Sequence, residues 1–366
     1  MNSRERVMAA INHREADRVP YDFWGTSEAV EKLKRHLKLP DKEAVLDRLD
    51  VDLRYIDGPE YVGPNLKSGD IDEDIWGVKR QKAVTGEGDK RGTYRMVVES
   101  PLANISTIDE AEAYDHWPSP DWYDYSVIEE QCEKVREKGR IVVFVGDRTN
   151  RVAQFKPYMY IRGMENAYVD MAVNPELFEY ITGRISSFYL EYLKRILAAA
   201  KGKIDIFQTG DDFGGQTNLL CSREMWRQFL MPGFQKFMEV IRAHKVTTMH
   251  HTCGFVVPII DDMIECGLHI LNPIQPFLPG MEAEMLKQRF GKRIVFHGGI
   301  SIQKNLPFGS PEAVRQEVQS AMRILAPGGG YIPCTAHNVQ ADVPIENILA
   351  LYDAYREFGR YPVNRS

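Results

Sequence analysis

Four short runs alternate with longer segments between residues 205 and 298: DIFQTG at 205–210, TTMHH at 247–251, HILNP at 269–273 and IVFHG at 294–298. Each run is short and rich in apolar or β-branched residues, which is typical of a buried strand. In the segments between the runs, apolar residues recur at three- and four-residue intervals, which is typical of amphipathic helices. This alternation predicts βα units around a parallel sheet.

The same alternation continues outward toward both ends of the chain. Further candidate strands cover 19–23, 53–57 and 141–146 on one side and 330–336 on the other. Candidate helices cover the segments 175–200, 223–244, 256–266, 282–290, 311–325 and 344–358. Eight strands with intervening helices predict an α/β fold, a single (β/α)₈ TIM barrel over residues 1–366. The alternative is a doubly wound sheet, but no glycine-rich phosphate-binding turn follows a strand and opens a helix.

Two segments fall outside this repeat. The first twenty residues carry charges throughout and have a helical pattern, which predicts an N-terminal helical extension. Residues 60–122 are polar and rich in Gly, Pro and Asp, with β-like pieces at 76–84 and 93–99. We expect a β-rich insertion after the second strand. At the C-terminal face of a barrel, such an insertion would cap or wall the active site.

Composition excludes several classes of protein. A net charge of −6 and a pI near 5.9 argue against a nucleic-acid-binding surface. A mean hydropathy of −0.36 and the lack of a run of about 18 apolar residues predict no membrane span. With no signal peptide in the N-terminal segment, we expect a cytoplasmic protein. Five cysteines are an odd number, which favours free thiols or metal ligands over disulfides. The oligomeric state stays open, a homodimer included.

Metal-binding residue types stand at the ends of two predicted strands. His251 and Cys253 are two residues apart on an extended segment, so both side chains project to one side and can reach one ion. Cys334 and His337 follow at the end of the last strand, and the C-terminal ends of barrel strands face one opening. Three of these four residues would make a zinc site with one open position. Because three residues separate Cys334 from His337, the choice between them stays open.

The loop after 205–210 carries two neighbouring acids, Asp211 and Asp212. Adjacent carboxylates cannot share one face of a strand, so we expect different roles for them. One would cap the next helix, while the other would act as an acid, a base, a metal ligand or an anchor for a polar substrate.

Other polar residues also follow strand ends. Four of them are candidates to bind a neutral polar or aromatic substrate, or else to satisfy loop backbone groups: Asn272, Gln275, His297 and Gln303. Three arginines after the strand at 141–146 are left unassigned between binding a carboxylate and lying in solvent: Arg148, Arg151 and Arg162.

Several motifs occur in a fixed order along the chain: RVP at 18–20, GDD at 210–212, SREMW at 222–226, HTCG at 251–254, NPIQP at 272–276, FHGGI at 296–300 and VPIENI at 343–348. Over nearly the whole chain this order resembles the uroporphyrinogen decarboxylase superfamily, whose fold is a (β/α)₈ barrel. True decarboxylases carry Arg-Gln-Ala-Gly-Arg after the first strand, whereas this chain has DFWGT at 22–26. A substrate with many carboxylates would therefore be poorly neutralised. Asp57 matches the position of their essential aspartate.

The cobamide-dependent methyltransferases of this superfamily are similar in carrying a zinc-bound His-x-Cys pair and a further cysteine near the end of the eighth strand. His251 and Cys253 match the pair, and the third position falls on His337, with Cys334 as its substitute. The resemblance implies a zinc-dependent methyltransferase that moves a methyl group between a small molecule and the corrinoid of a separate protein. Asp57, Asp211 and Asp212 are then the catalytic candidates, and the four polar residues named above would orient the small molecule.

Two other hypotheses compete with this one. The first is a metal-free decarboxylase or lyase that uses Asp57 on a small carboxylated substrate. The second is a barrel that binds a ligand without turnover. Metal analysis separates the methyltransferase hypothesis from the first, and the effect of replacing His251 and Cys253 on ligand affinity separates it from the second.

Overall fold

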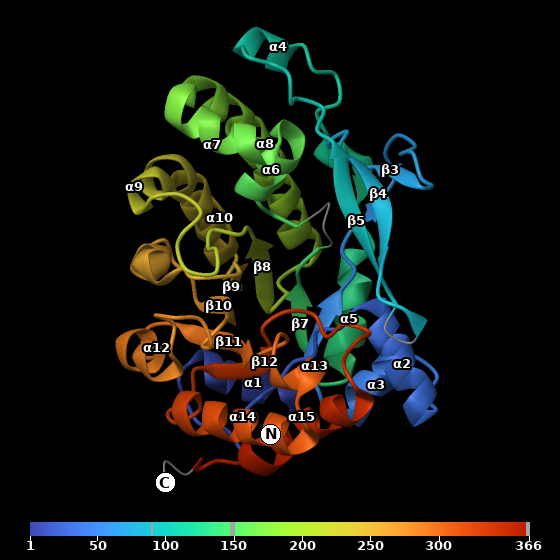
Figure 1. Ribbon diagram of the computed structural model, residues 1–366, viewed down its shortest axis with the longest axis vertical. Helices are drawn as coiled ribbons and strands as arrows, with labels where there is room; N and C mark the ends of the chain where they lie inside the picture. Colours follow the sequence, from blue (N-terminus) through green and yellow to red (C-terminus); the bar gives the residue numbers. More distant parts are fainter. Residues whose placement is uncertain (89–90, 147–150, 364–366) are drawn as a thin grey trace.

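The computed structural model describes residues 1–88, 91–146 and 151–363, so Arg148 lies outside the described residues. Seven parallel strands form one sheet, and sheet neighbours follow chain order (Figure 1). The strands are β1 (Leu53–Ile56), β7 (Ile141–Phe144), β8 (Ile206–Gly210), β9 (Thr247–His251), β10 (Ile270–Ile274), β11 (Val295–Ile300) and β12 (Tyr331–Thr335). In the described sheet the order shows no reversal of the kind that defines a doubly wound fold, and the predicted α/β class is confirmed.

Helices connect these strands near the predicted positions. They are α5 (Ile128–Glu137), α6 (Phe155–Arg162), α7 (Met164–Val173), α8 (Pro175–Ala199), α9 (Arg223–Met225), η3 (Trp226–Leu230), α10 (Met231–Ala243), η4 (Val257–Ile259), α11 (Ile260–Glu265), α12 (Ala283–Phe290), α13 (Asn305–Phe308), α14 (Pro311–Leu325) and α15 (Ile345–Phe358). Within the described part of the chain, no helix is both long and apolar enough to cross a membrane.

The sheet is curled around a small apolar cluster. Every strand contributes at least one buried residue to this cluster: Leu53, Ile141, Val143, Ile206, Met249, Ile270, Val295 and Ile332. In a flat sheet, strands about 4.8 Å apart would spread these side chains over roughly 29 Å. Because they meet in one cluster instead, the sheet must be curled. Val7 and Ala10 of α1 (Ser3–Ile11) join the same cluster, so the N-terminal helix packs against the interior of the curled sheet. The predicted N-terminal helix is thus confirmed.

The predicted strand at 19–23 is wrong: the structure has an extended segment there and no strand. The Asp22 N–H donates to the Pro333 carbonyl of β12 at 3.1 Å, and the Tyr21 carbonyl accepts from the Asp52 N–H at 3.0 Å. The segment therefore lies between β12 and the residue before β1. Pro20 and Pro333 both lack an N–H group, and this prevents a regular ladder of hydrogen bonds between the two segments.

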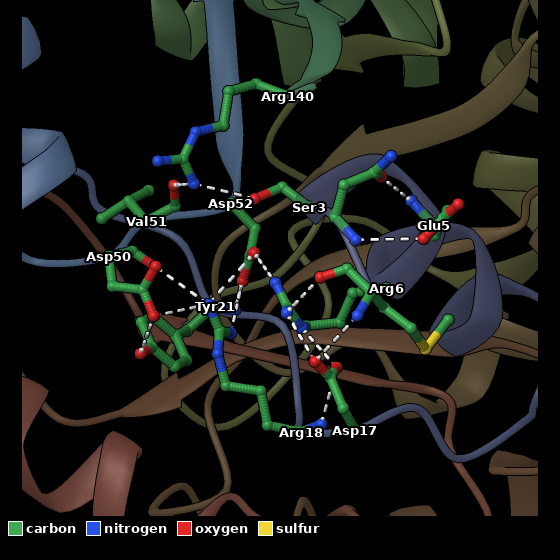
Figure 2. A network of polar contacts seen from close by, with 12 residues as sticks. Ser3, Glu5, Arg6, Asp17, Arg18, Tyr21, Asp50, Val51, Asp52 and Arg140 are labelled. Carbon is green, nitrogen blue, oxygen red and sulfur yellow. Dashed lines mark hydrogen bonds and ion pairs between the residues drawn. The ribbon is translucent and has the colours of Figure 1, made fainter. Parts of the chain in front are cut away.

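A buried ion network holds this segment in place (Figure 2). Asp52 is fully buried, and its carboxylate accepts from Arg6 Nη1 at 2.7 Å and Arg18 Nη1 at 2.6 Å. It also accepts from the Tyr21 N–H at 3.0 Å. One carboxylate before β1 thus joins α1 to the segment that borders β12.

The predicted β-rich insertion at 60–122 is present. It contains β2 (Glu60–Tyr61), β3 (Ile71–Glu73), β4 (Lys79–Thr85), β5 (Gly92–Glu99), α4 (Ile108–Glu112) and the short helix η2 (Pro120–Trp122). Strands β3, β4 and β5 form a separate antiparallel sheet, seen at the right of Figure 1. β2 pairs with β6 (Tyr123–Asp124) just after the insertion. Two short helices, α2 (Ser27–Leu37) and α3 (Lys42–Arg48), precede β1.

Candidate functional site

A cavity of about 400 Å³ lies at the C-terminal ends of the strands. Gly210 ends β8 and His251 ends β9, and both line it. Its other walls combine aromatic, cationic and polar side chains, among them Trp24, Tyr55, Asp74, Trp76, Arg80, Arg151, Lys156, Tyr160, Tyr189, His337 and Asn338. Because Asp74, Trp76 and Arg80 belong to 60–122, the insertion forms part of the wall, as the sequence predicts.

Three potential metal ligands lie close together, and one of them, His251, lines this cavity. His251 Nε2 lies 3.5 Å from Cys253 Sγ and 3.8 Å from Asp212 Oδ1. The three ligand atoms all lie within 4.8 Å of one another. A tetrahedral zinc ion with bonds of about 2.0 Å to nitrogen and 2.3 Å to sulfur separates those two atoms by about 3.5 Å. The His251–Cys253 distance therefore fits a common zinc ion.

Burial sets the protonation of this group. It lowers the pKa of His251 well below its usual value, an effect that Arg151 reinforces, so Nε2 or Nδ1 keeps a lone pair near neutral pH. Burial also raises the pKa of the Cys253 thiol to about 12, and the Asp212 carboxylate adds to this. A thiol of that pKa loses its proton at neutral pH only to a bound cation.

The structure separates the roles of the two neighbouring acids. Asp211 is buried and accepts from the backbone N–H groups of Gln154, Phe155 and Lys156 at 2.6–3.0 Å, which caps the start of α6. Asp212 instead lies beside His251 and Cys253. Its Oδ1 accepts from the Cys253 N–H at 3.1 Å, and its Oδ2 accepts from Lys156 Nζ. Burial alone would raise the pKa of Asp212, but Lys156 outweighs it and holds the carboxyl below its usual range.

The two candidates for a third protein ligand lie in different surroundings. The His337 ring lies 6.5 Å from the His251 ring, centroid to centroid, and lines the cavity. Cys334 is buried in β12, and its thiol belongs to a second group with Asp22 and His297. Burial and Asp22 raise the pKa of the Cys334 thiol well above its usual value. His337 thus shares the cavity with His251, whereas Cys334 lies in a separate group of potential ligands, and which of the two binds a metal stays a prediction.

The predicted substrate-binding residues lie outside the described cavity wall. Asn272 and His297 are fully buried and hydrogen bonded to each other at 2.6 Å. Gln275 is also buried, and its Oε1 accepts from the Gly254 N–H, which supports the turn after Cys253. Gln303 and Asp57 are exposed. Contact of these residues with a substrate stays a prediction.

Several residues at the site have no counterpart among the sequence predictions. Trp24 stacks on the His251 ring at 5.6 Å with an interplanar angle of 24°, and its Nε1–H donates to the Tyr55 hydroxyl at 2.7 Å. Lys156 and Arg80 add positive charge to the cavity wall. The sequence offered one signal for Trp24. Asp22 and Trp24 are two residues apart on a segment predicted to be extended, so their side chains are expected to project to one side.

The fold and the site define an α/β protein with a candidate metal centre at the ends of its parallel strands. The family described as Uroporphyrinogen decarboxylase (URO-D) matches residues 107–358. The chain therefore belongs to the uroporphyrinogen decarboxylase family, as its motifs predict.

Individual relatives refine this placement. The methylcobamide:CoM methyltransferase MtaA of Methanosarcina barkeri is 32% identical over 143 residues, which are 38% of this chain and 38% of that protein. A uroporphyrinogen decarboxylase of Psychromonas ingrahamii is 23% identical over 209 residues, 55% of each chain. The chain thus spans well under two thirds of the length of these relatives. The predicted resemblance to the cobamide methyltransferase branch is confirmed.

A solved structure extends the likeness to the whole fold. The methyltransferase from Methanosarcina mazei superposes with a TM-score of 0.68, covering 98% of this chain and 99% of that one. At 19% sequence identity this likeness shows a common fold.

Proposed function

We propose that this protein is a zinc-dependent methyltransferase that moves a methyl group between a small molecule, such as a thiol or a methyl ether, and the corrinoid of a partner protein. The observation that carries the proposal is the group formed by His251, Cys253 and Asp212 beside the cavity. The similarity to methylcobamide:CoM methyltransferases supports methyl transfer that involves a corrinoid.

The donor set fits zinc. Imidazole nitrogen, thiolate sulfur and carboxylate oxygen are all zinc ligands, and three protein ligands leave one position of a tetrahedral zinc ion open. His337 lines the same cavity, with its ring centroid 6.5 Å from that of His251, and would have to move closer to bind the same ion. Bound zinc supplies a Lewis acid that lowers the pKa of a thiol or hydroxyl, or polarises the oxygen of a methyl ether.

The chain's own side chains prepare the remainder of the reaction. Lys156 pairs with Asp212 and holds the pKa of that carboxyl low, so a proton released by a thiol or hydroxyl acceptor would pass to solvent and not stay on Asp212. Trp24 and Tyr160 line the cavity with aromatic surface that excludes water from a small apolar group. The cavity stands at the open ends of the strands, where the corrinoid of a partner protein would have to approach.

Demethylation of methylcobalamin in the presence of thiol acceptors tests the activity. We expect a zinc-dependent change in corrin absorbance, with one methyl thioether formed for each methylcobalamin consumed. Release of CO₂ from small carboxylates without metal, in place of methyl transfer, would support a decarboxylase instead.

A matched pair of substitutions tests whether His337 or Cys334 adds a further ligand. His337→Ala is expected to lower zinc affinity by roughly a hundredfold, because four ligands contribute about 10–16 kcal/mol in structural zinc sites. Cys334→Ala is expected to leave zinc affinity unchanged within about threefold, because that thiol lies with Asp22 and His297. Competition with a chromophoric chelator measures both affinities. The reverse ranking would assign the ligand to Cys334.

Zinc affinity should rise with pH. The Cys253 thiol has a pKa of about 12 without metal, so zinc binding near neutral pH must displace its proton. His251 is neutral in this range and adds no second proton. We expect the dissociation constant for zinc to fall about tenfold for each pH unit between pH 6 and 8. A flat profile in chelator competition would show that the thiolate is not a ligand.

A further inference from the structure

A chain of buried hydrogen bonds connects the Asp22 carboxylate with His251. We infer that Asp22 determines which ring nitrogen of His251 is free to bind a metal, acting through His297 and Asn272. Asp22 is therefore a positioning residue that does not itself touch the metal group. Only the consequence for zinc rests on the proposed function, because the tautomer of His251 is a property of the metal-free protein.

This series of hydrogen bonds begins at the Asp22 carboxylate, which is surrounded by donors. Asp22 Oδ1 accepts from the Phe23 N–H at 2.7 Å, and Oδ2 accepts from the Tyr55 hydroxyl at 2.5 Å. The Tyr55 oxygen itself accepts from Trp24 Nε1–H, which directs the Tyr55 hydrogen toward Asp22. His297 Nε2 lies 3.0 Å from the same Oδ2. Oδ2 thus accepts from Tyr55, and with His297 Nε2 as the second donor to the same oxygen, His297 carries its hydrogen on Nε2.

The next two hydrogen bonds carry this choice to His251. Asn272 presents its Nδ2 donor to His297 Nδ1 at 2.6 Å, so this ring nitrogen accepts and the hydrogen of the ring lies on Nε2. The Asn272 Oδ1 acceptor then faces His251 Nδ1 at 2.8 Å. His251 therefore carries its hydrogen on Nδ1, and the lone pair of Nε2 points toward Cys253 and Asp212.

The opposite arrangement is disfavoured by Asp22. Gln208 Nε2 donates to Asn272 Oδ1 at 3.2 Å, so both amides would have to turn over together. His251 would then carry its hydrogen on Nε2 and lose its metal-binding lone pair. His297 would present a lone pair to the buried Asp22 carboxylate, and two acceptors would face each other away from water. The Asp22 carboxylate thus selects one donor-to-acceptor direction for all the hydrogen bonds between Asp22 and His251.

Asp22→Asn tests the inference, because it replaces the acceptor that faces His297 with a donor of nearly the same shape. The amide can still accept from the Phe23 N–H, while its N–H groups favour a His297 hydrogen on Nδ1. Nitrogen-15 NMR of histidine-labelled, metal-free protein reads the tautomers directly. We expect His251 to carry its hydrogen on Nδ1 in the wild type and to shift toward Nε2 in the variant. Zinc affinity should fall about ten- to a hundredfold.

Tyr55→Phe is the matched control. It removes one donor to Asp22 but keeps the carboxylate, so the His251 tautomer should remain that of the wild type. A wild-type His251 with its hydrogen on Nε2 would overturn the inference. So would a folded Asp22→Asn protein that keeps both the wild-type tautomers and the wild-type zinc affinity. If the Asp22→Asn variant does not fold, the wild-type spectrum still tests the inference, because it shows which ring nitrogen of His251 carries the hydrogen. A protein that binds no zinc would refute the proposed function, while the tautomers would still test this inference.

Discussion

Replacing Cys253 by alanine is expected to lower zinc affinity by roughly a hundredfold or more and to abolish methyl transfer. The thiol is the strongest zinc donor in the group with His251 and Asp212, and a structural zinc site gains about 10–16 kcal/mol from four ligands. Activity should fall further than affinity, because the remaining ligands would hold the ion in an altered geometry. Zinc content after dialysis and the rate of methylcobalamin demethylation measure the two effects.

Cys266→Ala is the matched control for this substitution. Cys266 is a buried free thiol that follows α11 and belongs to neither of the two groups of potential ligands among the described residues. We expect this variant to lose some stability by leaving a small cavity, and to keep its zinc and its activity. If both variants keep zinc equally well, Cys253 is not a ligand and the proposed centre is wrong.

Replacing Asp52 by alanine is expected to lower the free energy of unfolding by about 3–5 kcal/mol. The substitution leaves two buried guanidinium groups, those of Arg6 and Arg18, without their shared carboxylate (Figure 2). Removing one partner of a buried ion pair costs this much, and Arg6 and Arg18 would keep only their pairs with the exposed carboxylates of Asp17 and Asp50. Urea unfolding followed by circular dichroism gives the value.

An exposed ion pair provides the control for Asp52. Asp353 pairs with Arg356 at 2.6 Å on the surface of α15, and its side chain is 59% exposed. Asp353→Ala should change the free energy of unfolding by about 1 kcal/mol or less. A loss below about 1 kcal/mol for Asp52→Ala as well would mean that the buried network does not hold the segment at 19–23 in place.

Local patterns predicted most of the fold. The strand expected at 247–251 coincides with β9, and the helix expected at 311–325 coincides with α14, because short apolar runs and helical periodicity are properties of the segments themselves. The segment at 19–23 could not be assigned in this way. Its hydrogen bonding depends on Pro333, which lies more than 300 residues away in the chain and lacks the N–H that a ladder needs.

The candidate site could likewise be predicted only where neighbouring residues in the sequence determine it. His251 and Cys253 could be paired from the sequence, because residues two apart on an extended segment project to one side. The roles of Asp211 and Asp212 could not be separated, because the partner that Asp211 caps is α6, which belongs to an earlier βα unit. The partners of Asn272 and His297 are likewise distant in sequence, so the sequence could not show that both side chains are buried in hydrogen bonds to His251 and Asp22.

The metal content of the protein tests the central claim most directly. The protein should be purified without a histidine tag and without added metal, and its zinc should be measured by mass spectrometry against protein concentration. We expect about one zinc ion per chain in the wild type and almost none in a His251→Ala, Cys253→Ala double variant. A wild-type protein that holds no zinc, and that binds added zinc no more tightly than the double variant, would contradict the proposed function.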